Sequence, residues 1–219
     1  MTERTRTARW LDALAAPRDA AGLAAFRVAV GALVCVSAIR FLAYGWVDEL
    51  FVKPSFFFKY WGFAWVAPLP APGMHALFVA LAVLGAAYAA GLLYRVVAPL
   101  LFVAFTYVQL VDVTNWLNHY YLVSLLLLLT SFMPLGRAWS LDAWLFPRTR
   151  LAAFPAWCTY LPRFQVAVVY FYAGMAKLTG DWLLHAQPLD IWLHARTGMP
   201  VLGALFDQRW VAYLFAWGG

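Results

Sequence analysis

The sequence predicts an all-α fold: a polytopic transmembrane helical bundle of about five full spans plus the start of a sixth, with short interfacial helices. Of the 219 residues, 65% are hydrophobic and only 12% are charged, about half the charged share that is usual in soluble domains. The mean hydropathy of +0.73 agrees with a membrane protein. Apolar runs of about 20 residues, the length that crosses a bilayer as a helix, recur along the chain.

Each span is predicted from one such run, in chain order. A tight turn at Tyr94-Arg95 separates the second run from the third, Pro134 ends the fourth, and Gly180 is expected to end the fifth. The expected spans are 22–44, 74–93, 96–113, 116–133 and 163–179, with a sixth beginning near Trp210.

Basic residues orient these spans, because Lys and Arg concentrate in cytoplasmic loops. With a cytoplasmic N-terminus, the cytoplasmic side carries Arg4, Arg6, Arg9, Arg18, Arg95, Arg137, Arg148, Arg150 and Arg163, and the other side carries Lys53, Lys59, Arg196 and Arg209. Residues 1–21 are therefore expected to form a cytoplasmic segment, and residues 22–219 one transmembrane domain. The bases flank spans and form no stripe, so no nucleic-acid partner is predicted. The two cysteines have neither disulfide-framework nor metal spacing, and no metal site is expected.

Two polar clusters interrupt the apolar runs and predict a functional site. Lys177, one of three lysines, ends the run of the fifth span, and ionisable groups in membrane segments are costly and usually functional. The other cluster, residues 112–121, contains Asn115, Asn118 and His119 between the third and fourth spans. In the predicted topology both clusters lie on the external side of the membrane, so we expect them to share one site.

Helical spacing adds residues to each cluster. Tyr170 precedes Lys177 by seven residues and falls on the same helix face. Gly174 lies on this stripe and would let a neighbouring helix or a ligand approach closely. If the turn within 112–121 is helical, its polar residues three or four apart also share one face.

Each of these residues also has an ordinary structural interpretation. Lys177 could extend to the interface and favour the helix dipole, or be a buried amine that serves as a base. His119 could be a hydrogen-bonded interface residue or, with Asn118, a donor to a developing oxyanion. Arg40 could extend to the interface or pair inward with an acid such as Asp112.

The aromatic connections are expected to lie at the membrane interface. Phe56–Trp65 forms an interfacial belt or, alternatively, a wall of a lipid-like substrate pocket, and Tyr121 is a belt residue or a ligand contact. Ser140–Leu145 is expected to be a short capped helix on the membrane surface, and Pro188–Arg196 another. Arg27, near the start of the first span, is expected to extend to the interface.

Several segments resemble motifs of one known family. Phe171-Tyr-Ala-Gly-Met-Ala-Lys177-Leu-Thr-Gly-Asp-Trp182 is similar to the AG-x-x-KL…DW motif of vitamin K-dependent γ-carboxylases, and Asn115-Trp-Leu-Asn118-His119-Tyr-Tyr121-Leu to their W-x-NH-x-YL motif. Ser140-Leu-Asp142, the pattern in Phe57–Trp65 and Phe26-Arg27 fit the same family. From about residue 20 to its end, the chain resembles the HTTM membrane-domain superfamily, which includes bacterial members. We therefore expect an integral protein of a bacterial inner membrane.

The resemblance implies a reaction. A lysine at the position of Lys177 deprotonates reduced vitamin K, molecular oxygen attacks, and the strong base that results removes a γ-proton from glutamate, to which carbon dioxide adds. His119 and Asn118 are implied to stabilise the oxygenated intermediate. The implied cofactor is reduced vitamin K or a related quinol, with oxygen and carbon dioxide as co-substrates and no metal. The implied partners are membrane lipid, the quinone and a glutamate-containing protein or peptide. The residues expected to bind the quinone are Arg40, Asn115, Tyr121, Tyr170 and Gly174.

The chain departs from the family pattern in two places. Position 176 is alanine, where the animal enzymes carry a second lysine, and the sequence stops at the start of a further family helix. The domain is therefore expected to be incomplete at its C-terminus. Two other functions stay open: a non-catalytic quinone- or lipid-binding module that uses Arg40 and the aromatic segment, and a transporter or assembly subunit with Lys177 and Asp112 as a proton relay.

Overall fold

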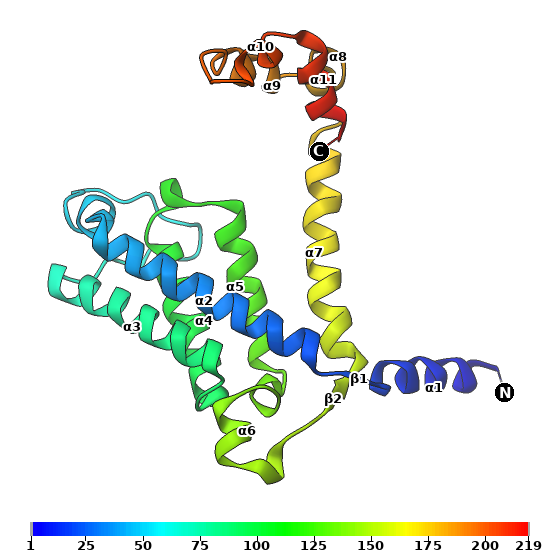
Figure 1. Ribbon diagram of the computed structural model, residues 1–219. Coiled ribbons are helices and arrows are strands. Elements are labelled where there is room, and N and C mark those ends of the chain that lie inside the picture. The colour runs from blue at the N-terminus through cyan, green and yellow to red at the C-terminus, as the bar shows by residue number, and fades with distance from the viewer. Residues whose placement is uncertain (1, 219) are drawn as a thin grey trace. The chain divides into compact units, whose positions relative to one another are not determined.

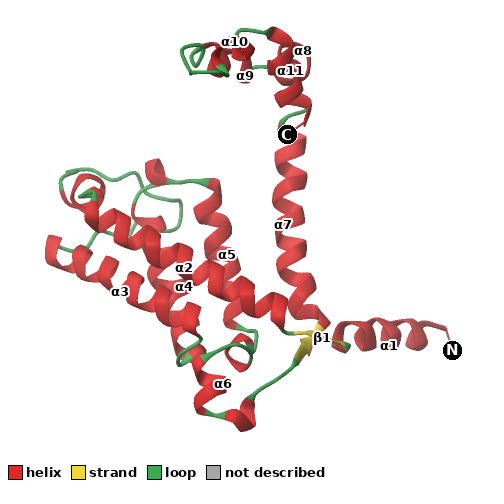
Figure 2. Ribbon diagram, in the orientation of Figure 1, coloured by secondary structure: helices red, strands yellow, loops and turns green. Residues whose placement is uncertain are grey.

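The computed structural model describes residues 2–218, with side chains described from residue 8 onward, and helices predominate in it (Figures 1 and 2). The chain divides into two compact units, residues 1–165 and 166–219, and the boundary falls inside helix α7 (Ala156–Ala176). The predicted helical character is confirmed.

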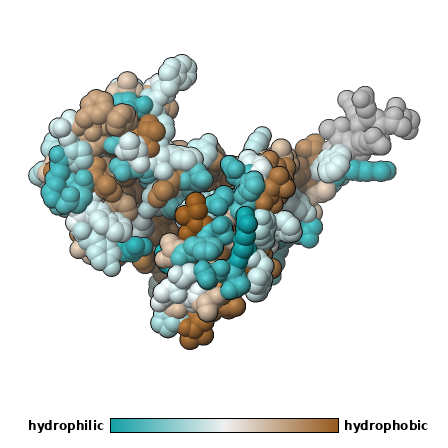
Figure 3. All heavy atoms as spheres, turned by 90° about the horizontal axis from the view of Figure 1, so that it is seen from above, coloured by the Kyte–Doolittle hydropathy of each residue, from teal (hydrophilic) through white to brown (hydrophobic). Residues whose placement is uncertain are grey.

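Three helices of unit 1 are long and apolar enough to cross a membrane. They are α2 (Ala21–Ala43), α3 (Ala71–Ala90) and α4 (Tyr94–Val111), with mean hydropathies of 2.1, 1.8 and 1.6. Only 39%, 28% and 39% of their most apolar stretches are buried, so most of these side chains face outward, as lipid-facing side chains do. Apolar side chains are visible at the surface in Figure 3. These helices confirm the first three predicted spans.

The five full spans that we predicted are not confirmed, because the next two helices differ from the expectation. Helix α5 (Asn118–Ser131) has 14 residues and is therefore about 21 Å long, which is shorter than the hydrocarbon core of about 30 Å. Helix α7 has 21 residues, but Pro162, Arg163 and Gln165 lower its hydropathy. Gly180 does not end α7: the helix stops at Ala176, and Gly180 instead opens the next helix.

Two glycines let α2 and α3 pack closely. A Cβ atom added at Gly31 would lie 2.6 Å from the backbone nitrogen of Ala89, and one at Gly85 would lie 2.8 Å from that of Cys35. Small residues allow the backbones of membrane helices to approach each other in this way. A larger side chain at either position requires the two helices to separate.

The turn between α3 and α4 is at Gly91–Leu93, just before the Tyr94-Arg95 pair that we expected to form it. Gly91 has φ +65°, and a Cβ atom there would lie 2.4 Å from the Cβ of Ser140. Both the left-handed backbone conformation and the lack of space therefore require glycine at this position. Helix α6 (Leu141–Leu145) is the predicted short surface helix. Ser140 caps it by accepting a hydrogen bond of 3.0 Å from the Ala143 N–H.

Arg27 is fully buried, and the prediction that it extends to the interface is wrong. Its guanidinium donates hydrogen bonds to the carbonyls of Leu135 and Trp139, both at 2.6 Å. It also donates to Ala138 at 3.0 Å and Ala89 at 3.2 Å. One side chain near the start of α2 therefore holds the end of α3 and the segment between α5 and α6 together.

The aromatic segment 56–65 is attached to the far end of α4. Lys59 Nζ donates a hydrogen bond of 3.2 Å to the Val111 carbonyl, and the Val113 N–H donates one of 2.9 Å to the Phe58 carbonyl. These bonds fix a segment that has no regular secondary structure of its own.

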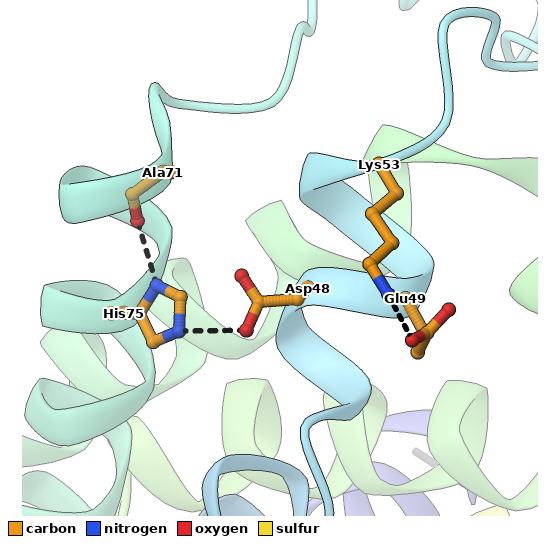
Figure 4. Close-up of polar contacts among 5 residues, drawn as sticks. All are labelled: Asp48, Glu49, Lys53, Ala71 and His75. Carbon is orange, nitrogen blue, oxygen red and sulfur yellow. Dashed lines mark hydrogen bonds and ion pairs between the residues drawn. The ribbon is translucent and has the colours of Figure 1, made fainter.

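A π-helical turn, η1 (Asp48–Val52), contacts the start of α3 at the same end (Figure 4). His75 Nε2 lies 3.3 Å from an Asp48 carboxylate oxygen, and His75 Nδ1 lies 2.9 Å from the Ala71 carbonyl. Lys53 pairs with Glu49 within the turn. Both pairs are exposed, and such pairs contribute little to stability.

Short elements complete unit 1. Strand β1 (Pro17–Asp19) pairs antiparallel with β2 (Ala153–Pro155), a contact that the sequence did not predict. The other elements are the helix α1 (Thr2–Ala15) and the 3-10 turns η2 (Val113–Asn115), η3 (Leu135–Arg137) and η4 (Pro147–Thr149).

Unit 2 contains the end of α7 and four short helices around a small core of Ala186, Ala212 and Ala216. Trp182 Nε1 donates a hydrogen bond of 2.7 Å to the Ala216 carbonyl. The helices are α8 (Gly180–His185), α9 (Leu189–His194), α10 (Gly203–Phe206) and α11 (Arg209–Gly218). Helix α9 confirms the short helix that was expected within 188–196.

Candidate functional site

The polar cluster of residues 112–121 lies at the junction of α4 and α5. The turn η2 follows α4, and Trp116 and Leu117 are extended before α5 begins at Asn118. The shared helical face depended on this turn being helical throughout, and that condition is not met, because two extended residues separate Asn115 from Asn118.

Asp112 explains why the helix stops there. Its side chain is 6% exposed, and Oδ1 accepts hydrogen bonds of 2.9 Å from both the N–H and the hydroxyl of Thr114. The ion pairs of the described residues include none between Asp112 and Arg40, so of the two alternatives for Arg40 the inward pair with Asp112 is not observed. Burial, and after it the Asp112 charge, raise the pKa of the Tyr60 phenol.

A cleft of about 560 Å³ opens beside this junction, between the ends of α2 and α4, the turn η1 and the start of α5. Two of the residues that we predicted to bind a quinone, Arg40 and Asn115, line it. The Arg40 guanidinium carbon lies 5.4 Å from the centroid of the Trp46 ring, which is a cation–π distance. The other lining residues are Ser37, Phe41, Glu49, Leu50, Phe51, Val108, Gln109, Thr114, Leu117 and Tyr120.

The other motif residues of unit 1 lie next to this cleft without lining it. Asn118 and His119 are exposed in the first turn of α5. The His119 ring packs against Tyr120 with centroids 4.6 Å apart, and Tyr120 lines the cleft. Tyr121 is 54% exposed and its ring lies 6.5 Å from that of Trp116, which favours its interpretation as a belt residue.

The cleft residues that sequence reasoning missed include Trp46, Glu49 and Gln109. Gln109 is a polar side chain in an otherwise apolar run, which is the type of pattern that pointed to Lys177. Glu49 is not in such a run, so no comparable pattern identified it. Among the described residues, no three His, Cys, Asp or Glu side chains are grouped so that they could hold a metal ion.

The remaining predicted residues belong to unit 2. Lys177 lies one residue after the end of α7, and its Nζ is 5.0 Å from the centroid of the Trp182 ring. Tyr170 is 74% exposed. Within unit 2, nothing approaches Gly174 closely enough to contact an added Cβ atom. The shared site of Lys177 and His119 stays a prediction, because the two residues lie in different units.

Fold and site together define a helical membrane protein with an aromatic and polar cleft at one end of its spans. The family model of the HTTM domain matches residues 15–219, and the chain belongs to this family. HTTM is the membrane domain of the vitamin K-dependent carboxylase family. No solved structure matches the chain.

Proposed function

We propose that this chain is the membrane core of a quinol-dependent γ-glutamyl carboxylase and epoxidase. Family membership supports the class of reaction, and the observation that carries the proposal for this chain is the cleft at Arg40 and Asn115. Its volume of about 560 Å³ lies within the range of about 300–1,000 Å³ that is usual for small-molecule sites.

The lining of the cleft suits a quinol ring. Phe41, Trp46 and Tyr120 supply aromatic surface for a flat apolar ring. Asn115 and Gln109 supply amides that can donate to or accept from its two oxygens, and lipid tails beyond the cleft would accept a prenyl chain. Mostly apolar walls with a few polar groups are typical of cofactor and ligand sites.

In this proposal Lys177 Nζ accepts the proton of a quinol hydroxyl, and Asn118 and His119 donate hydrogen bonds to oxygen as negative charge develops. When bound, reduced vitamin K or a related quinol would supply the electrons that reduce molecular oxygen, and this reaction would generate a strong base. Exclusion of water by the membrane protects that base and the glutamate carbanion. Carbon dioxide and a glutamate-containing protein or peptide complete the reaction, on the external face of a bacterial inner membrane with the N-terminus in the cytoplasm.

The test is epoxide formation from reduced vitamin K and oxygen, measured in membranes that contain the full chain. Lys177→Ala is expected to abolish epoxide formation, and His119→Ala is expected to reduce it by about 10²–10³-fold, the usual effect of removing an oxyanion donor. Lys53→Ala is the matched control, because Lys53 is an exposed lysine whose ion pair among the described residues is with Glu49. Epoxide formation that persists unchanged in Lys177→Ala would refute the assignment of the base.

A non-catalytic quinone-binding module is the second candidate, and one observation favours it. All the residues that line the cleft lie in unit 1, so a ligand could bind there without Lys177. This function predicts saturable quinone binding that Asn115→Ala or Arg40→Gln weakens, with no oxygen consumption by the wild-type chain. Oxygen consumption that depends on Lys177 would exclude it.

A further inference from the structure

We propose that a second cleft, at the opposite end of α4, binds the phosphate group of an anionic phospholipid. This cleft has a volume of about 710 Å³. It lies between the first turn of α4, the end of α5, the turn η3 and the segment after α6. Its polar lining includes Arg95, Arg137 and Asp142, with Ser131 and Thr149. The proposal is independent of any quinol chemistry.

The charges in this cleft are unbalanced. The Asp142 carboxylate is occupied, because its two oxygens accept the N–H groups of Leu93 and Tyr94 at 2.7 and 2.8 Å. Arg95 and Arg137 make no ion pair and no side-chain hydrogen bond with any described residue. Two guanidinium groups and one carboxylate leave the lining with an excess of one positive charge, and guanidinium donors that no described residue engages attract an anion, because their planar donor pairs match phosphate oxygens.

Exposed aromatic side chains place this cleft at the depth of lipid headgroups. Phe132 and Trp144 are each 74% exposed, Trp139 is 63% exposed and Phe146 is 59% exposed. Trp139 and Trp144 support this depth, because exposed Trp side chains near an end of a set of spans are typical of the membrane–water interface.

The source of the phosphate follows from the apolar part of the lining. Phe132 and Phe146 line the cleft itself, together with Leu93, Val96 and Met133. A soluble phosphate ester has no apolar chain to contact these walls, whereas the acyl chain of a phospholipid can pack along them. Basic pockets between membrane helices bind anionic lipid headgroups in this way.

The experiment titrates the purified full chain, in a zwitterionic detergent, with dihexanoylphosphatidylglycerol and records binding by calorimetry. Arg95→Gln and Arg137→Gln are each expected to weaken binding by about 5-fold, and the double variant by about 30-fold. The matched control is the double variant Arg148→Gln/Arg150→Gln. It removes the same charge from two exposed arginines, in and just after η4, that do not line the cleft. Its affinity is expected to stay within about 2-fold of wild type.

Two further ligands separate the sources of the phosphate. Dihexanoylphosphatidylcholine is expected to bind at least about 10-fold more weakly, and inorganic phosphate is expected not to displace the bound lipid. Displacement by inorganic phosphate would mean a site for soluble phosphate and would overturn the lipid assignment. Equal binding of the two lipids, or an unchanged affinity in the Arg95/Arg137 double variant with an unaltered melting profile, would overturn the site itself.

Discussion

Replacing Arg27 with alanine should destabilise unit 1 strongly, because this side chain joins three segments that are distant in sequence. Its guanidinium holds four carbonyls: Ala89 at the end of α3, and Leu135, Ala138 and Trp139 between α5 and α6. Outside the regular helices and strands, no other hydrogen bond of the described residues reaches these carbonyls. Alanine cannot reach any of them, so all four lose their donor at once.

The size of the effect follows from the two shortest bonds. The bonds to Leu135 and Trp139 are both 2.6 Å long, and a hydrogen bond to a charged group contributes about 1.5–3 kcal/mol. We count no net stabilisation from the two longer bonds, because their contribution offsets the desolvation cost of burying the guanidinium. The alanine variant loses both. The expected loss is therefore about 3–6 kcal/mol in the free energy of unfolding.

The measurement is equilibrium unfolding of the purified full chain by titration with a denaturing detergent. Arg27→Lys should lose about half as much as the alanine variant, because an ammonium has three donors and lacks the planar arrangement of a guanidinium. Arg95→Ala is the matched control, since Arg95 is exposed and bonds to no described side chain. A change of less than about 0.5 kcal/mol for Arg27→Ala, the range of ordinary surface substitutions, would refute the reasoning.

Three further predictions concern stability. Gly31→Ala should lower the free energy of unfolding by about 1–3 kcal/mol in the same assay, because its Cβ would lie 2.6 Å from the Ala89 backbone nitrogen. Its control is Gly22→Ala, whose Cβ would meet nothing within 4 Å and which should change stability by less than about 1 kcal/mol. Asp142→Ala should cost about 1–3 kcal/mol by leaving two N–H groups of α4 without acceptors, and an effect below that of Gly22→Ala would contradict this. Stability should fall as the pH rises above about 10, because the Tyr60 phenol ionises in the unfolded chain while its raised pKa keeps it neutral in the fold. Between about pH 9 and about pH 11, Tyr60→Phe should lose less unfolding free energy than the wild type.

Hydropathy was enough to predict α2, α3 and α4, because an uninterrupted apolar run of this length has few other stable states in water or lipid. The same reasoning did not suffice for α5 and α7, which are not confirmed as full spans. The Asp112 side chain caps η2, the extended residues Trp116 and Leu117 follow, and α5 therefore begins only at Asn118 and ends at Ser131. None of these features changes the hydropathy of the run. Local hydrogen bonds of this type decide where a helix ends, and a hydropathy average does not detect them.

The buried role of Arg27 shows a second limit. In sequence, Arg27 and Arg40 are alike, since each is one arginine near an end of the same apolar run. In the structure Arg27 is enclosed by carbonyls from distant segments, whereas Arg40 is exposed and lies over Trp46. The difference comes from what the rest of the chain presents to each guanidinium, and no local pattern contains that information.

The two clefts lie at opposite ends of α4, whose 18 residues span about 27 Å. They share no lining residue. Substitutions more than about 10 Å apart with no common partner usually act independently. Arg95→Gln/Arg137→Gln should therefore leave quinone binding at the Asn115 cleft unchanged, and Asn115→Ala should leave the affinity for phosphatidylglycerol unchanged. If either variant altered both affinities, the two ends of the spans would be coupled, and the helices between them would have to exist in two arrangements that both ligands distinguish.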